Sequence, residues 1–213
     1  MTNDDICIRF YEARDREAVR RICCETGFLG KPIDPVFEDR ELFADYLTSY
    51  YTDVEPESSL VIEQGGEVKG YLLGSWHPWR QKFYEAWLLP WLAVRGLLHY
   101  GRYRAETRDY IAWVLKSSRK EVPPAPKVEA HFHFNILPEA QSWRGTQTMV
   151  EMFFDYLRRV GVKSVGGQLV TVGERRLRML ERMGFKVLGR GEITKWRGKC
   201  EEPVFLTNAV KEL

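Results

Sequence analysis

The sequence contains few cysteines, and they are not arranged for metal binding. Cys7, Cys23, Cys24 and Cys200 form no CxxC pair and have no histidine at ligand spacing. Because structural zinc sites need such closely spaced ligands, we expect no metal site. The cysteine pattern is instead typical of a protein kept in a reducing compartment, which predicts a cytoplasmic location.

The sequence also lacks a charge imbalance and a long apolar run. Its 32 Lys and Arg nearly balance 30 Asp and Glu, and this net charge of +2 gives no argument for a nucleic-acid partner. The apolar run 86–100 is too short to span a bilayer and contains Pro90 and Arg95. The first five residues, Met-Thr-Asn-Asp-Asp, have neither the basic nor the apolar part of a signal peptide.

The rest of the composition is that of an ordinary globular protein. Of 213 residues, 44% are apolar and 29% are charged, which excludes disordered and collagen-like classes. A chain of this length buries enough surface for one large core. We therefore predict a single α/β domain over residues 1–213.

The most informative segment, 129–162, has the pattern of a strand, a short loop and an amphipathic helix. From Glu129 to Asn135, polar and apolar side chains alternate with the period of two that a strand with two different faces requires. After Pro138 the apolar residues recur at helical spacing until Gly161, which we expect to end the helix. The loop between them presents backbone N–H groups and the positive end of a helix dipole, an arrangement that suits a phosphate.

At these residues the chain resembles the GCN5-related N-acetyltransferase superfamily, in which a Gln/Arg-x-x-Gly-x-Gly/Ala loop after a central strand binds acetyl-coenzyme A. Aligned without gaps, the first motif position falls on Gln141, the first glycine on Arg144 and the last on Thr146. A one-residue insertion instead places the two glycine positions on Gly145 and Gln147.

The flanking segments extend the resemblance to roughly residues 5–75 and 127–213. Residues 60–63 and 67–73 are strand-like runs joined by Gly65-Gly66, the signal of a tight hairpin. Downstream, 163–170 is strand-like, 172–183 resembles the family's last helix before Gly184-Phe185, and another strand follows at 186–188. The resemblance implies a mixed, mostly antiparallel central sheet flanked by helices, with a helical insertion at about 76–126.

The resemblance also implies a function and a cofactor site. The chain would transfer the acetyl group of acetyl-coenzyme A directly to a primary amine of a small molecule, peptide or protein; the alternative is a non-catalytic acyl-coenzyme A-binding or sensing module. The residues expected to bind the cofactor are Asn135, Ile136, Leu137, Gln141, Ser142, Trp143, Arg144, Gly145, Thr146, Gln147 and Gly173.

Two departures from the family pattern concern the last helix. The family's frequent asparagine, which contacts the pantetheine arm, falls on Gly173, and its frequent tyrosine, the acid for the leaving thiolate, falls on Leu180. The thiolate would then be protonated by water, by Tyr156 or by a tyrosine of the insertion.

The candidates for the general base lie on the polar face of the 129–135 strand. His131 is the first choice, followed by Glu129 and His133, because an imidazole titrates near neutral pH. The alternative is that each is a hydrogen-bonded structural residue. The thioester carbonyl would be polarised by a backbone N–H near Ile136 or Leu137.

An acidic segment precedes the hairpin. Residues 34–57 contain eight acids and one base, Arg40, and the spacing of Leu42, Tyr46 and Tyr50 predicts an amphipathic helix with an acidic outer face. That face is either simply solvated or a rim that attracts a cationic amine to the acceptor site.

The insertion holds five of the seven tryptophans: Trp76, Trp79, Trp87, Trp91 and Trp113. We expect helices that break at Pro90 and Gly96, and a Pro-rich return linker at 122–126. The tryptophans would pack this part onto the sheet, line an acceptor wall or a homodimer interface, or form a basic surface on membrane lipid, although membrane association is not favoured.

Overall fold

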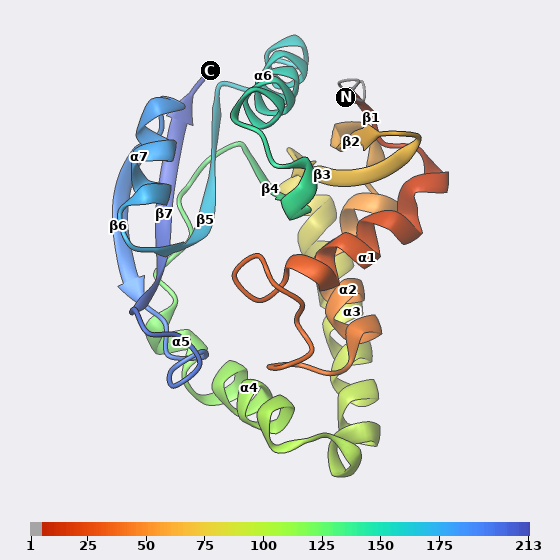
Figure 1. The fold of residues 1–213 in the computed structure, drawn as a ribbon, viewed down its shortest axis with the longest axis vertical. Helices are drawn as coiled ribbons and strands as arrows, with labels where there is room; N and C mark the ends of the chain where they lie inside the picture. Colours follow the sequence, from red (N-terminus) through yellow and green to blue (C-terminus); the bar gives the residue numbers. More distant parts are fainter. Residues whose placement is uncertain (1–5) are drawn as a thin grey trace.

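The computed structural model describes residues 6–213, and its centre is a seven-stranded sheet with the order β1-β2-β3-β4-β5-β7-β6 (Figure 1). Only β4 and β5 are parallel; the other neighbours are antiparallel. The expected mixed, mostly antiparallel sheet is therefore confirmed. Its strands are β1 (Cys7–Phe10), β2 (Leu60–Gln64), β3 (Glu67–Ser75), β4 (Ala130–Ile136), β5 (Ser164–Val172), β6 (Lys186–Glu192) and β7 (Val204–Glu212).

Helices cover both faces of the sheet. Along β2, Val61 packs in a core with α1 and α2, whereas Leu60 and Ile62 pack in a second core with α6 and α7. This alternation follows from the two-residue period of a strand. The helices are α1 (Arg16–Thr26), α2 (Arg40–Asp53), α3 (Pro78–His99), α4 (Ala105–Lys116), α5 (Ser118–Glu121), α6 (Trp143–Arg159) and α7 (Arg175–Arg182).

Local sequence signals explain the elements around the site. Gly65 and Gly66 have φ of 60° and 78°, the left-handed pair that a two-residue hairpin turn between β2 and β3 requires. Helix α6 begins after its N-cap Ser142. It is followed by Gly161 at φ 84°, the glycine that the sequence predicts at the end of this helix. At Gly74 a Cβ atom would lie 2.3 Å from the Phe153 ring, so the glycine lets α6 approach β3 closely.

The insertion is helical, but α3 does not break where expected. It runs for 22 residues through Pro90 and Gly96. Proline removes one helical hydrogen bond, to the carbonyl of Ala86, and Ala86 is exposed, so water can replace the lost donor. The prediction of breaks at Pro90 and Gly96 is therefore wrong.

The tryptophans of the insertion divide into two groups. Trp76 and Trp113 are partly buried against the two cores. Trp79, Trp87 and Trp91 are 80%, 69% and 47% exposed, so the core-packing interpretation is wrong for these three. Helix α3 therefore has apolar residues on both sides: these three tryptophans are exposed, and Leu88 and Leu92 are buried on its inner face. No helix within residues 6–213 combines the length and apolarity needed to cross a membrane.

Candidate active site

The two parallel strands at the middle of the sheet separate after a short contact. Within the described chain, β4 and β5 pair only at Ala130 with Val165 and at His131 with Gly166. Beyond these pairs, every second N–H of β4 points to the side from which β5 has departed. The structure therefore has a gap in its backbone ladder next to His131.

The direction of the N–H groups follows from one hydrogen bond. The Leu137 N–H donates to the carbonyl of Lys69 at 2.9 Å, on the β3 side. By alternation, the Ile136 N–H points toward the gap. Of the two donors proposed for the thioester carbonyl, Leu137 is thus already occupied, and Ile136 remains.

The loop after β4 leads to the N-terminus of α6, where two of the expected donors are already used. The Ser142 hydroxyl accepts the Gly145 N–H at 3.0 Å, and the Ser142 carbonyl accepts the Thr146 N–H at 3.0 Å. The expectation that these two groups are free is therefore wrong, because Ser142 caps the helix. The N–H groups of Trp143 and Arg144 are left in the first turn, and both residues are exposed.

Two other expected cofactor residues have structural hydrogen-bond partners, and a third, Gly173, has a conformational role. The Gln141 amide donates to the Ile136 carbonyl at 3.1 Å and braces the loop. The Asn135 amide donates to the Tyr71 hydroxyl at 2.7 Å, on the α1–α2 face of the sheet. Gly173 has φ of 60° in the turn between β5 and α7, a conformation that favours glycine. Gln147 is exposed on the first turns of α6.

The strand face expected to hold the base brings two histidines together with a tyrosine of α2. The Nε2 of His131 lies 2.9 Å from the Tyr51 hydroxyl. The His133 ring packs edge-on against Tyr51 and Tyr71, with ring centroids 5.0 Å and 5.8 Å apart. Burial raises the pKa of Tyr51, so its hydroxyl stays protonated at neutral pH.

Glu129 is not part of this cluster. It lies before β4 and is exposed; its carboxylate accepts the Lys163 N–H at 2.8 Å, and its own N–H donates to the Ser164 hydroxyl at 3.2 Å. These bonds hold the start of β4 beside the start of β5. The structure therefore places Glu129 in a bracing position, away from the side chains of His131 and His133.

A buried carboxylate that the sequence did not single out lies behind the histidines. Glu55 is fully buried, and β3 places its partner Ser75 directly opposite His131 in the sheet. The acid was counted with the surface acids of 34–57, and its only local signal is its place between the end of α2 and Pro56. Its carboxylate oxygens accept from the Tyr50 hydroxyl (2.6 Å), the Ser75 hydroxyl (2.8 Å), the Trp76 N–H (2.9 Å) and, at 3.1 Å from Nδ1, His77.

The environment sets the charge of each group. Burial raises the pKa of Glu55, but its hydrogen bonds outweigh burial and hold this pKa below its ordinary value. Burial lowers the pKa of His131 more than the charge of Glu55 raises it. Burial and the neighbouring His131 lower the pKa of His133 to about 3. At neutral pH the cluster therefore contains one carboxylate and two neutral imidazoles.

The buried neutral His133 should make stability depend on pH. Its folded pKa of about 3 lies below the 6.5 of a free imidazole, so the unfolded chain binds the proton more tightly. We expect the free energy of unfolding to be unaffected above pH 6.5 and to fall toward pH 3, with a slope approaching about 1.4 kcal/mol per pH unit for one proton. Urea unfolding of wild type and His133→Phe at several pH values measures it. Equal slopes in both proteins would contradict the assignment.

Solved structures that are similar to this fold include acetyltransferases. No protein-family model matches the sequence. The structure of SsHAT is 26% identical, with 98% of each chain covered and a TM-score of 0.70. A Drosophila melanogaster polyamine N-acetyltransferase that forms N-acetylagmatine is 13% identical (98% and 100% covered, TM-score 0.58), and yncA of Salmonella typhimurium, a putative acetyltransferase solved with its cofactor acetyl-CoA, is 16% identical (98% and 94%, 0.56). The chain therefore has the fold of the GCN5-related N-acetyltransferase superfamily.

The chain departs from the pattern of this superfamily where the sequence indicated. Leu180, at the position of the usual tyrosine, is 3% exposed and packs in the core under α7. Tyr156 accepts a hydrogen bond from the Trp76 indole at 3.3 Å. The chain therefore has no phenol at the position of the usual tyrosine.

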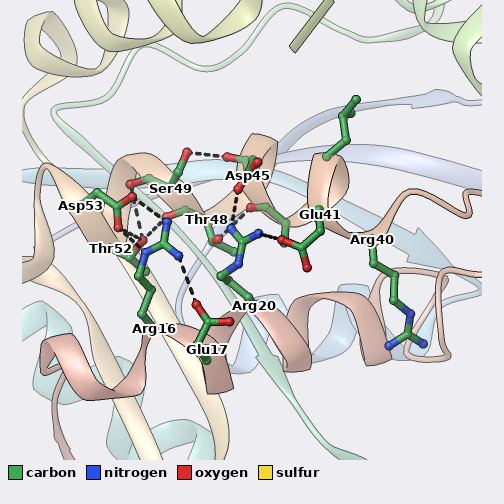
Figure 2. A network of polar contacts seen from close by, with 12 residues as sticks. Arg16, Glu17, Arg20, Arg40, Glu41, Asp45, Thr48, Ser49, Thr52 and Asp53 are labelled. Atoms are coloured by element: carbon green, nitrogen blue, oxygen red, sulfur yellow. Dashed lines mark hydrogen bonds and ion pairs between the residues drawn. The ribbon is translucent and has the colours of Figure 1, made fainter. Parts of the chain in front are cut away.

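Most acids of the segment 34–57 form ion pairs with arginines. Figure 2 shows Arg16 and Arg20 of α1 reaching across to acids of α2. Seven of the eight acids of 34–57 pair with an arginine, and Glu55 is hydrogen-bonded to His77. Four of these partners come from the insertion: His77, Arg80, Arg95 and Arg104. The segment is therefore not an uncompensated acidic rim; it is a charged face that is partly solvated, since the Glu41 side chain is 69% exposed and that of Asp45 is 15% exposed. The pairs are Asp34–Arg40, Glu38–Arg104, Asp39–Arg95, Glu41–Arg20, Asp45–Arg20, Asp53–Arg16, Glu55–His77 and Glu57–Arg80.

Proposed function

We propose that the protein transfers the acetyl group of acetyl-coenzyme A directly to a primary amine. The observation that carries the proposal is the gap between β4 and β5, which has free N–H groups on one side, the N-terminus of α6 at one end and His131 at the other. An extended thioester fits such a gap, with its pyrophosphate at the helix N-terminus. The acetyltransferase neighbours support the same chemistry.

The proposed step uses one side chain and one backbone group. The amine nitrogen attacks the thioester carbonyl, whose oxygen accepts a hydrogen bond from the Ile136 N–H as negative charge develops. The nitrogen–carbon bond forms, the carbon–sulfur bond breaks, and the amine proton passes to the neutral His131. The leaving thiolate takes a proton from water, because a thiol pKa of about 8.5 is close to the ambient pH.

The test separates this reaction from the alternative. Coenzyme A release is measured with acetyl-coenzyme A and a panel of primary amines, and binding is measured by calorimetry. Binding with amine-dependent thiol release supports the transferase. Binding without release from any amine supports the non-catalytic module, which Arg144 in the loop and Leu180 in place of the tyrosine favour.

Arg144 should contribute to cofactor affinity. It is exposed in the first turn of α6, beside the free N–H groups. A charge-assisted contact to phosphate contributes about 1.5–3 kcal/mol, so Arg144→Ala should weaken acetyl-coenzyme A binding about 10- to 100-fold. Arg159→Ala removes the same charge from the other end of the helix and serves as the control. Equal affinities of the two variants in calorimetry would place the phosphate elsewhere.

A further inference from the structure

A cavity of about 170 Å³ lies between α2 and α3, and the proposed base is next to it. His133 lines it, and the Tyr51 hydroxyl, from another lining residue, is 2.9 Å from Nε2 of His131. The cavity thus leads from the surface of the insertion to the histidine pair. Its lining consists of Tyr46, Leu47, Tyr50, Tyr51, Gln81, Glu85, Leu88, Leu89 and His133.

The lining has the chemistry of a site for organic cations. It contains three tyrosine rings, whose faces attract positive charge, and one carboxylate, Glu85; it contains no lysine or arginine. One Glu85 oxygen accepts from the Gln81 amide at 2.7 Å. Among the described residues Glu85 has no basic partner, in contrast to the seven acids of the 34–57 segment that pair with an arginine. An occupant of this cavity therefore meets one uncompensated negative charge.

The two ends of the cavity differ. Tyr46 is 57% exposed and marks the mouth, whereas the Nε2 atom of His133 is buried and has no hydrogen-bond partner in the described part of the chain. A donor group at the inner end would satisfy that nitrogen. A ligand with an N–H at one end and a positive charge at the other would match both ends of the cavity.

We infer that the acceptor is a short amine that carries a second positive charge. This inference rests on the proposed acetyl transfer. The reacting amine lies at the His131–His133 end, and the second charge lies between the Tyr46 ring and the Glu85 carboxylate. The size of the cavity limits the acceptor, since an apolar cavity of about 150 Å³ holds one benzene molecule. Long chains would have to extend through the mouth.

The test compares three acceptors that share a four-carbon chain and differ in the group at its far end. The probes are 1,4-diaminobutane, butylamine and 4-aminobutanoate, and kcat/KM is measured by thiol release. We expect a preference for the diamine over butylamine of about 10- to 100-fold, as for one charge-assisted contact, and the poorest rate for the carboxylate. Equal values for the diamine and butylamine would overturn the inference while leaving acetyl transfer intact. Cofactor binding without release from any of the three would contradict the proposed function instead.

Two test variants and one control variant locate the binding site of the second charge. Glu85→Gln should bring the ratio of diamine to butylamine kcat/KM close to one, chiefly by raising KM for the diamine. Glu106→Gln removes the same charge from the exposed side of the insertion and should keep the ratio. Tyr46→Leu, which removes one ring at the mouth, should also reduce the ratio and remains informative if the first variant does not fold. An unchanged ratio in both Glu85→Gln and Tyr46→Leu overturns the inference.

Discussion

Replacing His131 by alanine is expected to lower kcat/KM about 10²- to 10⁴-fold while nearly preserving acetyl-coenzyme A affinity. The reason is that the His131 imidazole is neutral and lies where β4 and β5 separate, on the strand that carries the proposed oxyanion donor. Thiol-release kinetics with a saturating amine measure the loss. Calorimetry measures the cofactor affinity separately.

The pH profile and a second variant distinguish a base from a structural residue. Since burial lowers the pKa of His131, the imidazole ionisation in kcat/KM should lie below pH 6.5, apart from any rise due to the amine itself. His131→Gln retains a hydrogen-bond partner for the Tyr51 hydroxyl but cannot take a proton. It should be as inactive as His131→Ala; recovery of activity in His131→Gln would show that the role is only to hold Tyr51.

Replacing Glu55 by alanine is expected to lower the free energy of unfolding by about 3–5 kcal/mol. The fully buried carboxylate accepts hydrogen bonds from Tyr50, Ser75 and the Trp76 backbone, and its removal leaves these donors without partners in a space that is closed to bulk water. Urea unfolding at pH 7 measures the change. At this pH the carboxylate is ionised in both states, so its contribution is fully present; it is lost as the pH falls through the lowered folded pKa.

A neighbouring acid provides the control for Glu55. Glu57 pairs with Arg80 at the surface, where both side chains are 45% exposed. Glu57→Ala should change the free energy of unfolding by about 0–1 kcal/mol, because exposed ion pairs contribute little. Similar small effects of the two substitutions would show that the Glu55 network does not hold α2 to β3.

The elements predicted from the sequence are those with strong local signals. The hairpin turn at Gly65-Gly66 and the end of α6 before Gly161 each depend on a few adjacent residues, and the structure confirms them. The β7 strand was not predicted. Its last residue, Glu212, pairs with Ser164 of β5 although the two are far apart in the sequence, and such pairing has no local signature.

Of the candidate site, the sequence predicted only the residues that lie on one strand, β4. The alternation along β4 identified His131 and His133, because the period of a strand places both on one face. Glu55 was missed because its hydrogen-bond donors lie on two other segments, Tyr50 in α2 and Ser75-Trp76 at the end of β3. The neutralised acids were missed for the same reason: Arg95 and Asp45 are 50 residues apart in the chain.

The separation of β4 from β5 is also the place where neighbouring strands of the sheet share the fewest residue pairs. Strands β1–β4 and β5–β7 share two residue pairs, whereas β5 and β7 alone are joined by nine. An opening fluctuation along this line breaks fewer backbone hydrogen bonds than one within either half, so amide hydrogens near it exchange with solvent from a sub-globally opened state. A molecule that binds between β4 and β5 contacts both halves of the sheet. Because it binds the closed state and not the opened one, its binding free energy stabilises the protein against this opening.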